Sequence, residues 1–195
     1  MKDYTKSKKY QAVLSTAQKL FWKHGFKRVS IEEICKEAEV SKMTFYKFFP
    51  NKIELAKIIL YNIIKEATRQ FLDIITSSCA FEEKIEQMIV MKMEGLKDIS
   101  ADFLNDIYKN PENTLLEYLT EYRQESMDMF VNFMEEAKKD GLVRADIKID
   151  FIIYQIDLLT QTVRDEKMLK LYQSTSDLVR ESMQYLFYGL MPIKK

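Results

Sequence analysis

One short segment of the chain, VSKMTFYKFFPNKIEL at residues 40–55, restricts what the sequence can fold into more than any other. Ser41 is a favourable N-cap and Pro50 ends any helix that starts there, so about two helical turns lie between them. A helix this short does not hold together alone in water, and one of its faces must pack against other elements. Three rings at helical spacing supply that face: Phe45, Phe48 and Phe49.

The remaining side chains of this short helix are mostly polar and point away from the rings. Met43, Tyr46 and Lys47 are spaced three and four residues apart, and Lys42 and Thr44 flank them. Together they offer two cations, two hydroxyl groups and a thioether, which suits the phosphates and base edges of a DNA major groove. We therefore interpret the segment as a recognition helix.

The residues just upstream predict a second helix followed by a sharp corner. Ser30 and Glu33 have the spacing of a capping box, and an apolar stripe continues over the next two turns. Only residues 39–41 separate this helix from the next one, which is the pattern of a helix-turn-helix. An ordinary corner between two helices fits the same pattern. The apolar stripe consists of Ile31, Ile34, Cys35 and Ala38.

Residue by residue, roughly the first quarter of the chain resembles the DNA-binding domain of TetR-family transcriptional regulators. The resemblance rests on Gly25, the run Val29–Ile31, Ile34, Ala38 and the ungapped segment 40–55. Two positions depart from the family pattern: Glu39 replaces the usual turn glycine, and Met43 replaces a residue that is usually small. The first departure implies a slightly different turn geometry, and the second leaves the base preference open.

This resemblance implies a fold, a division into domains and a set of DNA contacts. The expected fold is all-α, with a three-helix DNA-binding domain at residues 1–50 and a helical effector-binding and dimerisation domain at residues 51–195. Lys52 lies in the first turn of the next helix, where a cation is unfavourable, and a nearby phosphate would account for it. The expected base-edge residues are Lys42, Met43 and Thr44, and the other expected DNA-binding residues are Ser30, Ser41, Tyr46, Lys47 and Lys52.

The charge distribution agrees with a DNA-binding N-terminal part. The whole chain has no net charge, because 30 Lys and Arg balance 30 Asp and Glu. The first 52 residues, however, hold 12 basic and 5 acidic residues, a net charge of +7, and the remainder carries −7. A basic segment attracts phosphate, while the acidic remainder is kept off the polyanion.

Composition and periodicity predict that the rest of the chain is helical as well. Glycine and proline are rare, at four and three of 195 residues, and alternating strand patterns are almost absent. No apolar run approaches the ~18 residues that span a membrane, and no export signal is visible, so we expect a cytoplasmic protein. Cys35 and Cys79 are then expected to be free thiols. We expect about nine helices; besides the two of the helix-turn-helix, they lie at residues 3–24, 52–75, 81–97, 101–109, 112–140, 149–164 and 176–188.

The last two long helices carry more apolar surface than one core-facing stripe requires, which indicates a second partner. One short recognition helix reads only a few base pairs, whereas two copies about one DNA turn (~34 Å) apart read a palindrome. The resemblance implies that these helices form an intersubunit four-helix bundle, and hence a homodimer on a palindromic double-stranded operator. The expected interface residues are Phe151, Gln155, Leu158, Leu159, Thr162, Val179, Ser182, Met183, Leu186 and Phe187.

Two functions from different classes remain open on the sequence. The first is a ligand-responsive repressor that a small, mostly hydrophobic effector releases from DNA; the second is a DNA-bound architectural or co-regulator protein whose C-terminal half docks a protein. An enzyme is not expected, because one histidine, no Gly-rich phosphate loop and no metal-ligand cluster leave nothing to assemble a mechanism or hold a cofactor. The candidate effector-binding residues are Met91, Glu94, Gly95, Asp98, Phe103, Tyr108, Tyr118, Tyr122 and Met127.

Overall fold

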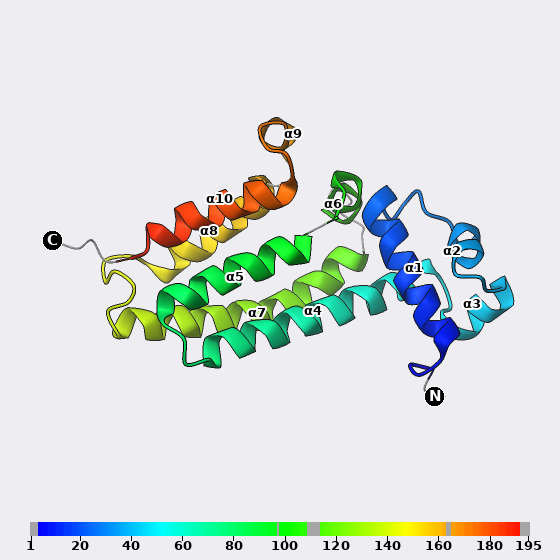
Figure 1. Ribbon diagram of the computed structural model, residues 1–195, viewed down its shortest axis with the longest axis horizontal. Helices are drawn as coiled ribbons and strands as arrows, with labels where there is room; N and C mark the ends of the chain where they lie inside the picture. The colour runs from blue at the N-terminus through cyan, green and yellow to red at the C-terminus, as the bar shows by residue number, and fades with distance from the viewer. Residues whose placement is uncertain (1–3, 97, 109–113, 163–164, 192–195) are drawn as a thin grey trace. The chain divides into compact units, whose positions relative to one another are not determined.

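The computed structural model describes residues 4–96, 98–108, 114–162 and 165–191, and within these ranges every regular element is an α-helix (Figure 1). The prediction of an all-α fold is confirmed. The helices are α1 (Lys8–His24), α2 (Ile31–Glu37), α3 (Lys42–Phe48), α4 (Lys52–Thr76), α5 (Phe81–Leu96), α6 (Ala101–Tyr108), α7 (Thr114–Lys139), α8 (Ile149–Thr162), α9 (Glu166–Leu169) and α10 (Thr175–Tyr188).

Most helix ends agree with the predicted ranges to within two residues. The first helix begins at Lys8 rather than at residue 3, and the four-residue helix α9 was not predicted. The predicted helix ends at residues 3, 97, 109, 112 and 164 lie outside the described residues.

The chain forms two compact units, and helices α4 and α7 contribute residues to both. Unit 1 comprises Met1–Lys65 with Asp98–Glu121, and unit 2 comprises Glu66–Lys97 with Tyr122–Lys195. The functional boundary that we predict at residue 50 is a separate division, which these units do not test.

Unit 1 has one hydrophobic core, to which α1, α2, α3, α6 and the first part of α4 contribute. Helix α1 packs against α2, α3 and α6 (Figure 1). The rings of Trp22 in α1 and Phe103 in α6 lie 4.5 Å apart, and Ser100 N donates a hydrogen bond of 2.8 Å to the Trp22 carbonyl. Helix α6, far along the chain, therefore belongs to the same packed unit as the helix-turn-helix.

The turn between α2 and α3 keeps a left-handed residue although the usual glycine is missing. Glu39 has φ 53°, a conformation that disfavours any side chain with a Cβ atom. Its N–H donates to the Lys36 carbonyl, and the Val40 N–H donates to the Cys35 carbonyl at 3.0 Å. These two bonds form a Schellman motif, which satisfies the last carbonyls of α2. The turn therefore has the geometry that glycine favours, and Glu39 adopts it at a conformational cost.

Unit 2 has a hydrophobic core of its own, built from α5, α8, α10 and the parts of α4 and α7 that it contains. Helix α10 packs along α5 and also contacts α8 (Figure 1). Buried residues of this core include Ile85, Met134, Ile152 and Phe187. Packing of this kind explains why helices with wide apolar stripes are stable here.

Candidate nucleic-acid interface

Helix α3 is anchored by its capped start and by its rings. Ser41 Oγ accepts a hydrogen bond of 3.1 Å from the Thr44 N–H, which satisfies one of the free donors at the helix start. The side chains of Phe45 and Phe49 are fully buried, and the Phe49 ring stacks on Tyr10 of α1 at 4.9 Å. The Phe48 ring packs edge-on against Tyr10 at 5.6 Å. The predicted apolar face of α3 is thus the face that packs against unit 1.

The opposite face of α3 is open to solvent. Met43 is 82% exposed and Tyr46 is 54% exposed, although both are large side chains. Lys47 is also exposed, and its ammonium lies 5.7 Å from the centroid of the Tyr4 ring. This face presents a thioether, a phenol and an ammonium together, which is the set of groups expected of a DNA-reading surface.

Two hydroxyl-bearing residues predicted to bind DNA, Ser30 and Ser41, also cap helices, and the hydroxyl of a third, Thr44, bonds to one of these caps. Ser30 Oγ accepts from the Glu33 N–H at 3.1 Å and so begins α2. The hydroxyl oxygens of Ser41 and Thr44 lie 3.0 Å apart, and Thr44 is half-buried. A hydroxyl that accepts from a backbone N–H still has its own hydrogen to donate to a phosphate oxygen. The capping role and the predicted DNA contact are therefore compatible.

Lys42 is paired with an acidic residue of the neighbouring helix. Its ammonium forms an ion pair with the carboxylate of Glu32 in α2, and both side chains are more than half exposed. The hydrogen bond to Glu32 raises the pKa of Lys42, and the same bond to Lys42 lowers the pKa of Glu32. The base-edge contact predicted for Lys42 thus competes with a carboxylate that lies on the same surface. Glu32 was not predicted as part of this surface, because its sequence position assigned it only to the first turn of α2.

Lys52 is held by backbone carbonyl groups. Its ammonium donates to the Phe26 and Val29 carbonyls at 2.7 Å each and to the Lys27 carbonyl at 3.3 Å. It also lies 4.5 Å from the centroid of the Phe26 ring. Burial lowers the pKa of Lys52, and the charge of Asp106 opposes that shift. These carbonyls account for a cation in the first turn of α4 without a phosphate, and the predicted phosphate contact stays a prediction.

Asp106 of α6 holds the same loop from another side. Its Oδ2 atom accepts a hydrogen bond of 2.8 Å from the Lys27 N–H. Gly25, with φ 82°, leaves room for that carboxylate, since a Cβ at this position would lie 2.7 Å from Asp106 Oδ2. Asp106 is 79 residues from Lys27 along the chain, so no spacing rule could have linked them.

The predicted dimer residues differ widely in how much surface they offer. Val179 and Phe187 are buried within unit 2, in two of its clusters, so their side chains offer almost no surface to a second subunit. Phe151 is exposed, and Gln155, Leu158, Leu159, Thr162, Ser182, Met183 and Leu186 are half-buried. Three exposed tyrosines of the same two helices were not among the predicted interface residues: Tyr154, Tyr185 and Tyr188.

The predicted effector residues fall into both units. Phe103 is buried in the core of unit 1, and Tyr108 and Tyr118 pack against that core. Met91 packs against the core of unit 2, and Met127 is half-buried. Glu94, Gly95 and Asp98 are exposed, and the side chain of Tyr122 lies outside the described part of the structure.

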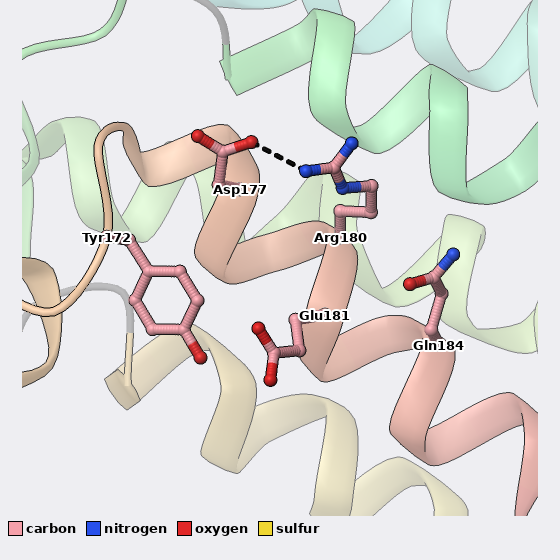
Figure 2. A pocket seen from close by; sticks show the side chains of 5 residues that line it. All are labelled: Tyr172, Asp177, Arg180, Glu181 and Gln184. Carbon is pink, nitrogen blue, oxygen red and sulfur yellow. Dashed lines mark hydrogen bonds and ion pairs between the residues drawn. The ribbon is translucent and has the colours of Figure 1, made fainter.

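Two hollows occur among the described residues of unit 2, and none of the nine predicted effector residues lines either of them. The larger, of about 380 Å³, is polar and open (Figure 2); Tyr172, Asp177, Arg180, Glu181 and Gln184 line it. Arg180 pairs with Asp177 at 2.8 Å. The pKa of Tyr172 is raised, mainly because its phenol is partly buried and also because it forms a hydrogen bond with Glu181. The smaller, of about 280 Å³, is lined by Ile75, Thr76, Met129, Asn132, Phe133 and Glu136.

Among the helices of the described residues, none is both long and apolar enough to cross a bilayer.

Comparison with known proteins places the helix-turn-helix in a family. A sequence model of the bacterial regulatory proteins of the tetR family matches residues 13–58. The HTH-type transcriptional repressor KstR2 of Rhodococcus jostii is 22% identical over 149 residues, which cover 74% of this chain and 72% of the relative. The matched relatives are named as transcriptional regulators, which supports the prediction that the chain is not an enzyme.

Solved structures share the fold along nearly the whole chain. The fatty acid degradation regulator FadR of Bacillus halodurans has a TM-score of 0.73 and 18% identity, and the match covers 93% of this chain and 96% of that one. A transcriptional regulator of Saccharomonospora viridis in complex with choline has a TM-score of 0.78 and 15% identity, with 96% and 100% covered. The helix-turn-helix of this chain therefore matches the tetR family of bacterial regulatory proteins, and the all-helical fold is one that a solved TetR-family regulator of Streptomyces coelicolor shares.

Proposed function

We propose that the chain is a homodimeric repressor that reads a palindromic operator with one α3 from each subunit. Residues 1–50 would serve as the DNA-binding domain and residues 51–195 as the effector-binding and dimerisation domain. The observation that carries the proposal is the face of α3 on which Met43 and Tyr46 stand exposed while the rings behind them are buried. Met43 and Tyr46 share this face with Lys47, so a thioether, a phenol and an ammonium are presented together to a partner.

The contacts on DNA divide into base reading and phosphate binding. Met43 offers an apolar contact to a thymine methyl group, and Lys42 and Thr44 offer donors to acceptors in the groove. Phosphate contacts carry no sequence information but fix the register of the helix on the duplex. The residues proposed for phosphates are Ser30, Ser41, Tyr46, Lys47 and Lys52.

The proposed dimer uses α8 and α10, which present exposed aromatic side chains. Tyr154 is 60% exposed and Tyr185 is 85% exposed, and Phe151 lies one helical turn before Tyr154. Aromatic residues are enriched where two proteins meet, since they bury a large area with little loss of side-chain freedom. We place the interface on these rings and on the half-buried Leu158 and Leu186.

An effector of mostly hydrophobic character is proposed to release the repressor from DNA. The hydrophobic character takes its support from relatives whose names refer to ketosteroid regulation and fatty acid degradation. A neighbour in complex with choline, a cation, supports only that the effector is a small molecule. Met91 and Met127 are the predicted effector residues that lie partly buried in unit 2. An effector can act only if it binds the non-DNA-binding state more tightly than the DNA-binding state.

Selection of bound sequences from random duplexes tests the DNA-reading part of this proposal. A palindrome with half-sites about one DNA turn apart is the expected result. A single asymmetric site, or no enriched sequence, would overturn the homodimeric reading.

The effector is tested by titrating the selected operator complex with long-chain fatty acids, fatty acyl thioesters, steroids and choline. Release from DNA by one of these classes, together with a rise in melting temperature, supports a ligand-responsive repressor. The DNA-bound co-regulator would be favoured by two results together. None of these compounds would alter operator binding, and the operator-bound chain would capture a defined protein. A reporter gene under the operator distinguishes repression from activation.

A further inference from the structure

We propose that Tyr4, which precedes α1, is a positioning residue that holds the ammonium of Lys47 ready for a DNA phosphate. The two residues lie far apart along the chain, yet the Lys47 ammonium is 5.7 Å from the centroid of the Tyr4 ring. This inference rests on the proposed phosphate contact of Lys47, and it adds a residue from outside the helix-turn-helix to DNA reading.

The ring of Tyr4 is held against α3 by other rings. It packs edge-on against Phe48 with the centroids 5.2 Å apart, and Phe48 packs edge-on against Tyr10 of α1. Tyr10 is buried while Phe48 and Tyr4 are half-buried, so the three rings lead from the core of unit 1 to its surface. Edge-on contacts of this kind stabilise a ring pair beyond the area that it buries. The outermost ring, Tyr4, is therefore fixed beside Lys47.

The backbone before α1 also holds Tyr4 in place. The Ser7 N–H donates to the Tyr4 carbonyl at 2.9 Å, which closes a turn over residues 4–7. The side-chain amide of Gln11 in α1 donates to the Thr5 carbonyl at 2.8 Å and ties this turn to the helix. Residues near a chain terminus stay mobile unless such contacts restrain them. Tyr4 is thus positioned from two sides, by its ring and by its backbone.

A ring orients an ammonium without using up its hydrogens. The face of the ring attracts the cation electrostatically, so the three N–H groups of Lys47 remain available to phosphate oxygens. Lys42 on the same surface differs, because its ammonium is paired with the carboxylate of Glu32, which a phosphate must displace. Tyr4 therefore limits the freedom of a long side chain while leaving its charge to the DNA.

The size of the effect depends on how often Lys47 occupies this conformation before DNA is bound. Affinity falls in proportion to the fraction of the protein that is already in the binding conformation. An exposed cation–π contact favours that conformation by a factor of about two to five. Loss of the ring should weaken operator binding by the same factor. The number of phosphates neutralised, and with it the slope of log K against log salt, should stay the same.

The test measures operator affinity against salt concentration for Tyr4→Leu and Tyr4→Phe. Tyr4→Leu keeps an apolar side chain against Phe48 but removes the ring face, so binding should weaken about two- to fivefold at an unchanged slope. Tyr4→Phe keeps the ring and should bind like the parent, since the hydroxyl has no part in the proposed role. Dissociation constants refer to active protein, counted by stoichiometric titration well below the melting temperature.

A double-variant cycle shows whether Tyr4 acts through Lys47. Lys47→Met alone should weaken binding and reduce the slope by about 0.9, because one phosphate contact is lost. In that background Tyr4→Leu should have no further effect, since no ammonium is left to orient. Tyr61→Leu is the matched control. The Lys65 ammonium lies 6.0 Å from the centroid of the Tyr61 ring in α4, and removing this ring should change neither the affinity nor the slope.

Four results would overturn the inference. Weaker binding by Tyr4→Phe would mean that the hydroxyl itself contacts DNA. An equal loss from Tyr4→Leu in the parent and in Lys47→Met would mean that Tyr4 does not act through Lys47. A lower melting temperature with an unchanged dissociation constant would leave Tyr4 a structural role only. An equal loss from Tyr61→Leu would mean that the effect is not specific to this ring.

Two outcomes separate this inference from the proposed function. Lys47→Met with the affinity and slope of the parent would remove Lys47 from the phosphate contacts and overturn the inference, while a selected palindrome would still support the proposed function. A parent protein without any operator preference would refute the proposed function. The same variants on an arbitrary duplex would then still decide the role of Tyr4, because phosphate binding does not depend on sequence.

Discussion

Glu32 is expected to reduce the affinity of this regulator for DNA, and its removal should therefore strengthen binding. The Glu32 carboxylate pairs with the ammonium of Lys42 on the proposed DNA-reading surface. Both side chains are exposed, so water and salt screen the pair and it contributes little to folding stability. Its main effect is on binding, since Lys42 must leave the carboxylate before it can neutralise a phosphate or contact a base.

The size of the effect follows from counterion release. Glu32→Gln leaves Lys42 free to neutralise one more phosphate, so the slope of log K against log salt should steepen by about 0.9. Between 200 mM and 50 mM salt, this slope difference amounts to about a 3.5-fold additional gain in affinity over the parent. Because phosphate binding is independent of sequence, a gain of similar size is expected on duplexes without the operator.

Fluorescence anisotropy of a labelled duplex at several salt concentrations and pH 7 measures this slope. Hydrogen bonding to Lys42 lowers the pKa of Glu32, so the carboxylate is fully charged in such an assay. Glu37→Gln supplies the matched control, because Glu37 is an exposed carboxylate of the same helix and the net charge changes equally. The same substitution in a Lys42→Met background should have little effect.

Two results would refute the reasoning about Glu32. One is an equal slope for Glu32→Gln and the parent, which would mean that Lys42 does not bind phosphate when it is released. The other is an equal steepening in Glu37→Gln, which would mean that only the overall charge matters and that the pairing does not.

Three further substitutions test the packing, the turn and the dimer. Phe45→Ala should destabilise the protein by about 3–5 kcal/mol in urea unfolding, since the ring is fully buried, and a loss below 1 kcal/mol would contradict its place in the core. Glu39→Gly should stabilise it by about 0.5–1 kcal/mol, because glycine adopts the left-handed turn freely but costs more unfolded-state entropy. Tyr185→Glu should convert the dimer to a monomer in sedimentation velocity, while Leu72→Glu, also at an exposed apolar position, should leave the dimer intact; a dimeric Tyr185→Glu would remove this tyrosine from the interface.

Local rules predicted the helix-turn-helix well because its determinants lie within four residues of each other. Ser30 and Ser41 cap the helices that the spacing indicated, and Asn51 Oδ1 accepts from the Glu54 N–H at 2.8 Å to begin α4. Phe45 and Phe49 lie on the buried side that helical periodicity assigned to them. Caps and periodic stripes depend on the local chain, so the sequence alone determines them.

The apolar stripes of α8 and α10 were harder to interpret, because periodicity shows which residues share a face but not what covers it. Val179 and Phe187 have the spacing expected of an interface, yet the core of their own unit buries them. The exposed rings of Tyr154 and Tyr185 lie off the stripe, where a single core leaves them uncovered. In helices with wide apolar surface, the residues outside the core-facing stripe are therefore the better candidates for contact with a partner.

The partner of a lysine was equally hard to predict from the sequence. Lys42 was predicted to bind DNA because it flanks the outward face of the recognition helix, and Lys52 because a nearby phosphate would account for a cation in the first turn of a helix. The structure gives them different partners: a carboxylate ten residues earlier for Lys42 and three backbone carbonyls for Lys52. An exposed carboxylate exchanges readily for a phosphate, whereas partly buried carbonyls hold their ammonium more firmly, since each would be left without a donor. Salt dependence should therefore steepen when the partner of Lys42 is removed.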